Sequence, residues 1–125
     1  MKIYSFDGVQ LYAHHECWLF KENHPEVFQS FGCGPGGLGD LFIPDNIFGV
    51  DVSNACRIHD WYYRFWPGNT EKDRKMADQL MRKNLLIIVR AKSNPFALWL
   101  REPICQIYYI MVRKYGVDAF FEERE

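Results

Sequence analysis

The chain has no long uninterrupted apolar run, although 48% of its 125 residues are hydrophobic. Its longest uncharged apolar run, PICQIYYIMV at residues 103–112, falls well short of the roughly 20 residues that a helix needs to cross a bilayer. The opening residues, MKIYSFDGVQLY, also lack the basic segment, the apolar run and the cleavage site of a secretory signal. These absences predict no transmembrane segment, and a chain that is either mature or leaves the cytoplasm by another route.

A large net charge is absent as well. The formal net charge is −1, which by itself implies no nucleic-acid partner. The charges are uneven, however, because residues 57–114 hold twelve Lys and Arg against five Asp and Glu, a net +7 that leaves −8 for the rest. That half could attract an anionic surface, or its basic residues could be the solvated faces of helices. Both interpretations stay open.

Paired C-x-x-C spacings of the zinc-binding kind do not occur. The four cysteines stand at positions 17, 33, 56 and 105 and allow three full pairings, so their redox state stays open. The segment HHEC at residues 14–17, taken with His24, suggests zinc, but no second cluster has ligand spacing. We therefore expect a surface or helix-capping role for these histidines.

The first 50 residues predict short elements. Asp7-Gly8, between two short apolar and aromatic runs, is a favoured two-residue turn, so a small N-terminal β-hairpin is expected. Residues 13–30 are expected to be partly helical, with an interruption at Pro25. Residues 32–50 are expected to be irregular because of their glycines and prolines.

The middle of the chain predicts a helix. Residues 51–66, DVSNACRIHDWYYRFW, contain no glycine or proline and offer Asp51 or Ser53 as a cap. The segment PGN at residues 67–69 is expected to end this helix. A tight turn at that point would make the helix that follows antiparallel to this one.

The second half predicts further helices. Thr70 can cap a second helix that runs to about Arg90, with Asp73 in its first turn, where the helix dipole favours an acid. A third helical stretch is expected after Pro103. No repeat, low-complexity tract or linker divides the chain, so the fold class predicted is one mainly α domain over residues 1–125, with two long antiparallel helices.

Glycine is scarce, with nine residues in all, yet four of them fall in FGCGPGG at residues 31–37. Glycine is used where the backbone turns sharply or approaches something closely. On the predicted helix, Cys56, His59 and Tyr63 share one stripe, while Asp60 projects about 100° to the side of His59. Asp60 could then approach the carbonyls of the glycine loop, and such a set of oxygens suits Ca²⁺.

Two segments together resemble a known family. CGPGGLG and, further on, ACRIHDWYY are similar to the calcium loop and catalytic helix of the phospholipase A2 superfamily, whose pattern is C-G-x-G-G-x-G followed by C-x-x-H-D-x-x-Y. The match covers residues 32–63 closely and extends through the second helix to about Arg90. Residues 1–30 and 95–125 hold no motif that matches the family.

The resemblance implies a calcium site and a reaction. Ca²⁺ would be bound by the main-chain carbonyls of Gly32, Gly34 and Gly36 and by the carboxylate of Asp60, and the amide N–H of Gly34 would help to hold the oxyanion. The implied reaction is calcium-dependent hydrolysis of the sn-2 ester of a glycerophospholipid at a membrane surface. The implied setting is secreted, or otherwise extracytoplasmic or on a virion.

The resemblance also implies roles for side chains. His59 would be the general base that activates water, and Asp78, in ADQLMRKN, would orient it. Tyr63 would donate a hydrogen bond to the same aspartate. A disulfide between Cys33 and Cys56 would fasten the loop to the helix.

Two departures from the family's animal members occur together. Those members form a bridge between the position three after the histidine and the residue before the orienting aspartate, and here these positions are Tyr62 and Ala77. The joint absence resembles the simpler microbial or phage-like forms. The other aspartate near this part of the helix, Asp73, is explained by capping and by the helix dipole alone.

Other interpretations stay open. The same fold could be a catalytically silent calcium-binding or lipid-binding module. A cysteine hydrolase using Cys33 or Cys56 with His59 belongs to another mechanistic class. The apolar segments at residues 94–100 and 41–48 could form a rim that sits on lipid, although we expect them to be core.

Overall fold

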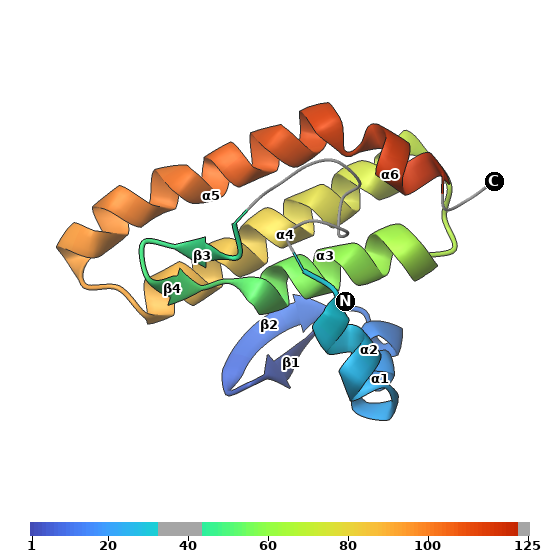
Figure 1. Cartoon of the computed structure of the whole chain (residues 1–125), viewed down its shortest axis with the longest axis horizontal. Helices are drawn as coiled ribbons and strands as arrows, with labels where there is room; N and C mark the ends of the chain where they lie inside the picture. The colour runs from blue at the N-terminus through green and yellow to red at the C-terminus, as the bar shows by residue number, and fades with distance from the viewer. Residues whose placement is uncertain (33–43, 123–125) are drawn as a thin grey trace.

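The computed structural model describes residues 1–32 and 44–122. In this part of the chain there are six helices and four short strands (Figure 1). The helices are α1 (His15–Asn23), α2 (Pro25–Ser30), α3 (Ser53–Phe65), α4 (Glu71–Ala91), α5 (Pro95–Tyr115) and α6 (Val117–Glu122). The strands are β1 (Lys2–Phe6), β2 (Val9–Ala13), β3 (Asn46–Ile47) and β4 (Val50–Asp51). The predictions of a mainly helical fold and of an N-terminal hairpin are confirmed.

The three longest helices, α3, α4 and α5, pack side by side, and each runs opposite to the one before it (Figure 1). α4 lies in the middle and contacts both of the others. The core lies along these contacts: Ile58 and Tyr62 of α3 are each 1% exposed, and Leu85 of α4 and Val112 of α5 are fully buried. α4 therefore presents side chains to α3 and to α5 at once.

The turn between α3 and α4 is as tight as the sequence predicts. Thr70 is the N-cap of α4, and Asp73 completes a capping box with it. The turn has a steric reason for glycine at position 68, because a Cβ on Gly68 would lie 2.4–2.5 Å from the carboxyl atoms of Asp73. The capping aspartate and the glycine before it thus fix where the chain reverses.

The N-terminal hairpin closes through Asp7 and Gly8, whose φ angles are 53° and 85°. Both angles are in the left-handed region that a two-residue hairpin turn of this kind requires. The hairpin is attached to α4 by Asn84, whose side chain accepts from the Tyr12 N–H at 2.9 Å and donates to the Tyr12 carbonyl at 2.9 Å. The amide of Asn84 is fully buried, and both of its polar ends are satisfied there.

The prediction of irregular backbone up to residue 50 is wrong for the end of that segment. β3 and β4 form a second, two-residue antiparallel pair, closed by Phe48 and Gly49 with φ angles of 45° and 89°. The turn is supported by Asn46, whose side chain accepts from the Gly49 N–H at 2.7 Å. A phenylalanine in a left-handed conformation is unusual, so this turn could not be predicted from its residue types.

The start of α3 also differs from expectation. The N-cap is Val52, and neither Asp51 nor Ser53 occupies that position. Asp51 still bonds to the first turn, because its Oδ1 accepts from the Ser53 N–H at 2.8 Å. The aspartate therefore satisfies a helix N–H from one residue earlier than a standard cap.

The third long helix begins eight residues earlier than predicted. α5 starts at Pro95, with Asn94 as the N-cap, and Pro103 lies inside it. Proline fits the first helical position but removes a hydrogen bond in the interior. The helix nevertheless continues through Pro103, and α5 packs on α4, with Leu98 before the proline packed against the core and Cys105 after it within the core. α6, which was not predicted, follows directly after Gly116.

The expectation that residues 94–100 belong to the core is wrong for most of their large apolar side chains, although Leu98 packs against the core. Phe96 is 72% exposed, Trp99 73% and Leu100 42%. In the other apolar segment, residues 41–43 lie outside the described residues, Ile47 is buried and Phe48 is 64% exposed. In the described ranges, none of the helices has the length and apolar character to cross a bilayer, which agrees with the prediction of no transmembrane segment.

Candidate active site

The antiparallel packing of α3 on α4 places His59 directly opposite Asp78. The distance from His59 Nε2 to Asp78 Oδ1 is 2.7 Å, and the two side chains are 2% and 0% exposed. Asp78 occupies the same face of α4 as Leu85 and Ile88, both buried. A carboxylate on this apolar face needs partners, because an unpaired buried charge is costly.

Tyr63 supplies a second partner from one turn further along α3. Its hydroxyl donates to the same oxygen of Asp78 at 2.7 Å, and its ring lies 4.2 Å from that of His59, centroid to centroid. Burial, followed by the charge of Asp78, raises the pKa of Tyr63 far above its usual range. The hydroxyl therefore keeps its proton and acts as a donor. The backbone of Gly116 lies close to this hydroxyl, because a Cβ on Gly116 would be only 2.8 Å from it.

Two arginines that the sequence analysis did not single out lie at the other oxygen of Asp78. Arg113 Nη1 lies 2.7 Å and Arg74 Nη1 3.4 Å from Oδ2. Arg74 also donates to the carbonyls of Val112 at 3.0 Å and Arg113 at 3.1 Å, and Glu71 accepts from both guanidinium groups. These contacts connect the end of α5 to the His59–Asp78 pair.

Only one of these arginines had a local signal in the sequence. Arg74 precedes Asp78 by four residues on the same helix, a spacing at which side chains meet. Arg113 is 35 residues away and comes from α5. Its position depends on how α5 packs on α4, so the local pattern could not reveal it.

The partners of Asp78 determine its charge and the tautomer of His59. Burial favours the neutral acid, but hydrogen bonds from His59, Tyr63 and Arg113 outweigh it and hold the pKa of Asp78 below its usual range. A carboxylate can only accept, so Nε2 of a neutral His59 carries the proton. The lone pair is then on Nδ1, for which the described residues provide no hydrogen-bond partner.

Asp60, the next residue after His59, is buried in a different environment. Its Oδ1 accepts from Arg64 Nε at 3.1 Å, whereas its Oδ2 is buried and has no hydrogen-bond partner among the described residues. Burial raises the pKa of Asp60 to about 6, against the opposing effects of Arg64 and of a backbone hydrogen bond from Gly32. Asp60 is only 1% exposed, so water does not compensate for the missing partner.

This environment fits a cation ligand in one respect. A buried carboxylate oxygen without a donor is a position that a hard cation could fill. The other implied ligands are not all available for comparison, because Gly34 and Gly36 lie outside the described residues. Arg64 bonds to Oδ1, so Oδ2 is the oxygen of Asp60 that a cation could meet without displacing Arg64.

The histidines near the N-terminus do not gather into a zinc site. Within residues 1–32 and 44–122, no three His, Cys, Asp or Glu side chains are close enough together to hold a metal ion. His14 instead caps α1 by accepting from the Glu16 N–H at 3.1 Å, which is the expected capping role. His15 Nδ1 contacts the Tyr4 hydroxyl at 2.9 Å.

The cysteines differ in state. Cys56 is disulfide-bonded, and its expected partner, Cys33, lies outside the described residues. Cys17 and Cys105 are both free thiols and both buried. Burial raises the pKa of Cys105 to about 11 and that of Cys17 still further, so neither is a ready nucleophile.

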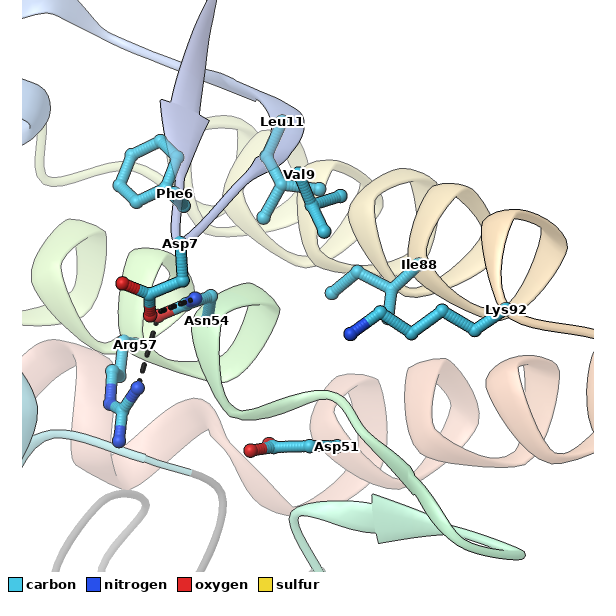
Figure 2. A pocket seen from close by; sticks show the side chains of 9 residues that line it. All are labelled: Phe6, Asp7, Val9, Leu11, Asp51, Asn54, Arg57, Ile88 and Lys92. Carbon is cyan, nitrogen blue, oxygen red and sulfur yellow. Dashed lines mark hydrogen bonds between the residues drawn. The ribbon is translucent and has the colours of Figure 1, made fainter.

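A small pocket lies at the other end of α3, between the hairpin and α4 (Figure 2). Its volume is about 90 Å³. Side chains of both charges surround it: Asp7, Asp51, Arg57 and Lys92, with Asn54 bonding to Asp7 and accepting from Arg57. Among the described residues no histidine or cysteine lines it, and it is separate from the site around His59.

The positions of the bridge found in the family's animal members are filled by packing. Tyr62 and Ala77 are each 1% exposed, and the Tyr62 hydroxyl accepts from the His14 N–H at 2.9 Å.

Comparison of the chain with models of known protein families, with curated proteins and with solved structures found no match.

Proposed function

We propose that this protein is a calcium-dependent, phospholipase A2-like hydrolase that cleaves the sn-2 ester of glycerophospholipids. The observation that carries the proposal is the buried set of His59, Asp78 and Tyr63, in which Asp78 holds His59 by Nε2 and leaves Nδ1 without a described partner. This is the arrangement that a general base needs: one nitrogen oriented by a carboxylate, the other available to water.

The proton path follows from this arrangement. His59 Nδ1 removes a proton from a water molecule, and the water oxygen attacks the ester carbonyl. Asp78 stabilises the imidazolium that forms, and the same proton then passes from Nδ1 to the departing alcohol oxygen. The products are a fatty acid and a lysophospholipid, and no enzyme atom becomes covalently attached.

Calcium would be held by Asp60 and, as the resemblance implies, by the carbonyls of Gly32, Gly34 and Gly36. When bound there, it would polarise the ester carbonyl and hold the lipid phosphate. The amide of Gly34 would donate to the oxyanion. Asp60 Oδ2 is buried and has no hydrogen-bond partner in the described part of the chain, which supports the metal part of this proposal.

Two other functions have less support. A silent lipid-binding or calcium-binding module would have no use for a histidine that is oriented so closely at a carboxylate. A cysteine hydrolase is disfavoured, because Cys56 is disulfide-bonded and Cys17 and Cys105 are buried thiols with raised pKa values. The disulfide also supports an oxidising setting, so we propose that the protein works outside the cytoplasm, either secreted or on a virion.

The test is fatty-acid release from a dispersed short-chain phosphatidylcholine, measured in Ca²⁺, in Mg²⁺ and in excess chelator. We expect turnover only with Ca²⁺, because Mg²⁺ demands a tighter octahedron than a backbone loop readily supplies. Thermal melts give a second readout: Ca²⁺ at 100 times its Kd should stabilise the wild type by about 2.7 kcal/mol, but not Asp60→Asn. Full hydrolysis in chelator would rule out this mechanism.

A further inference from the structure

Helix α5 is apolar on both of its faces. The side facing α4 carries the buried residues Cys105, Tyr108 and Val112. The opposite side, here called the outer face of α5, consists of Phe96, Trp99, Leu100, Pro103, Ile107 and Ile110, all exposed. Apart from the adjacent pair Trp99 and Leu100, these residues follow one another at steps of three or four, so they form one continuous stripe. At 1.5 Å per residue the stripe is about 21 Å long.

The outer face of α5 is almost entirely apolar, although it is exposed. None of the exposed positions between residues 95 and 110 is charged, and Gln106 is the one polar residue among them. A helix that is apolar all round is normally buried on all sides, yet α5 forms the edge of the molecule (Figure 1). Extended exposed apolar patches mark sites of association.

The patch extends beyond the helix. Phe48, at the β3–β4 turn, is 64% exposed and is tied to α5 by Arg101, whose Nη2 donates to the Phe48 carbonyl at 2.6 Å. On the helix itself, an open groove is lined by Trp99, Leu100, Glu102 and Pro103. The surface therefore combines three exposed aromatic rings, those of Phe48, Phe96 and Trp99, with an open groove.

Basic residues outnumber acids in the part of the chain that forms α5 and the end of α4. Residues 82–116 hold seven Lys and Arg but a single acid, Glu102, which is paired with Arg90 at 2.8 Å. Two of the seven point elsewhere: Arg113 pairs with Asp78 and Glu71, and Lys83 lies over the ring of Tyr12. Arg82 lies along the edge of the stripe, bonded to the Gln106 side chain at 3.2 Å. A second copy of this chain would bring the same positive surface against the first, whereas an anionic surface would be attracted.

We propose that the outer face of α5 docks the protein on an anionic lipid surface, with the helix lying parallel to the membrane. Phe96 and Trp99 would insert at the level of the headgroups, where aromatic rings are favoured, and the surrounding basic residues would meet anionic headgroups. The choice of a lipid occupant rests on the proposed function. The face itself is a surface separate from the His59 site, so the two can be tested separately.

Binding is measured with chelator present, so that no lipid is hydrolysed. The probe is a vesicle of phosphatidylglycerol and phosphatidylcholine with brominated acyl chains, which quench tryptophan fluorescence on contact. We expect the wild type to bind, with Trp99 quenched, and Trp99→Phe to bind with most of that quenching lost. Binding should weaken several-fold between 0.1 M and 0.5 M salt and should be weak on vesicles of phosphatidylcholine alone.

Two double variants remove equally exposed aliphatic side chains from different faces. Ile107→Ser/Ile110→Ser removes residues that are 48% and 53% exposed on the outer face of α5. Ile3→Ser/Val27→Ser removes residues that are 49% and 48% exposed on β1 and α2. We expect the first variant to lose about tenfold or more in vesicle affinity, and the second to stay within about twofold of the wild type, with both melting like the wild type.

Equal binding by the two variants, or binding to neutral vesicles that matches binding to anionic ones, would overturn the proposal. So would a wild-type dimer in sedimentation that Ile107→Ser/Ile110→Ser converts to a monomer, since the face would then join two copies. Hydrolysis of the dispersed substrate is followed in parallel. If hydrolysis fails while docking follows the variants, only the proposed function is wrong; if hydrolysis proceeds while docking ignores them, only the docking face is wrong.

Discussion

Two buried aspartates stand close to His59, and their surroundings are opposite. Asp78 has donors on both oxygens: His59 and Tyr63 on Oδ1, and Arg74 and Arg113 on Oδ2. Asp60 has Arg64 on Oδ1, while in residues 1–32 and 44–122 its Oδ2 has no hydrogen-bond partner. The two carboxylates are almost equally buried, at 0% and 1% exposure. Burial alone therefore does not decide the state of an acid; the donors around it do.

The pKa values follow this difference. The donors around Asp78 hold its pKa below the usual range in spite of burial, whereas burial raises the pKa of Asp60 to about 6. The protein supplies hydrogen-bond donors to both oxygens of Asp78, so this carboxylate needs no further partner. Among the described residues Asp60 Oδ2 has no donor, and a bound cation could take that place. This contrast assigns orientation of His59 to one acid and metal binding to the other within the proposed function.

The largest expected effect comes from replacing Asp78, whose two oxygens both have donors. Asp78→Asn should lower the free energy of unfolding by about 3 kcal/mol or more, because it leaves two guanidinium groups facing a neutral amide. Turnover should fall by about tenfold or more, because an amide no longer fixes the tautomer of His59. Urea unfolding and kcat on the dispersed substrate measure the two effects.

Calcium affinity provides the control for this variant. Asp60 is not among the hydrogen-bond partners of Asp78, so Asp78→Asn should bind Ca²⁺ with nearly wild-type affinity in a calorimetric titration. A loss of calcium binding as large as the loss of turnover would show that the two acids do not have separate roles.

The pH dependence of stability sharpens the comparison, because the two acids contribute with opposite signs. The pKa of Asp60 rises on folding from 3.8 to about 6, so its contribution to the free energy of unfolding is greatest below pH 3.8 and is lost as pH rises to about 6. The loss is about 3 kcal/mol. The pKa of Asp78 falls on folding, so its contribution is present above its unfolded pKa and is lost as pH falls below that value.

The measurement is the unfolding free energy of the wild type minus that of Asp60→Asn, without calcium, between pH 4 and pH 6. The difference isolates Asp60, because the other titrating groups are common to both proteins. We expect the wild type to lose stability relative to the variant as pH rises through this window, and saturating Ca²⁺ to reverse the loss at pH 7. A difference that does not change with pH would mean that folding does not raise the pKa of Asp60.

How far the sequence predicted these features depends on the range of the interactions. Local signals were sufficient for the Asp7-Gly8 hairpin and for the cap of α4 at Thr70. The pairing of His59 with Asp78 was implied by the resemblance to the phospholipase A2 superfamily, and the short turn between α3 and α4 brings the two side chains together. They were not sufficient for Arg113, whose contact with Asp78 depends on how a third helix crosses the second.

The errors have physical causes of the same kind. Pro103 is a strong helix breaker in isolation, but the packing of α5 against α4 outweighs its missing hydrogen bond. The apolar composition of residues 94–100 predicted core, and hydrophobicity alone cannot tell a side chain that is covered by the same chain from one that is left exposed, as Trp99 is.

The smallest expected effect concerns Asp73, five residues before Asp78 on the same helix. Its Oδ2 accepts from Thr70 N at 3.1 Å and Thr70 Oγ1 at 2.6 Å, and its Oδ1 accepts from Trp66 Nε1 at 3.1 Å. These are the contacts of a helix cap, and an asparagine can keep part of them. Asp73→Asn should therefore cost about 1 kcal/mol or less in urea unfolding and leave kcat on the dispersed substrate at the wild-type value. Because Asp73 and Asp78 differ in partners but share a helix, a kinetic loss that followed Asp73 and spared Asp78 would remove the orienting role from Asp78, and with it the role given to Tyr63.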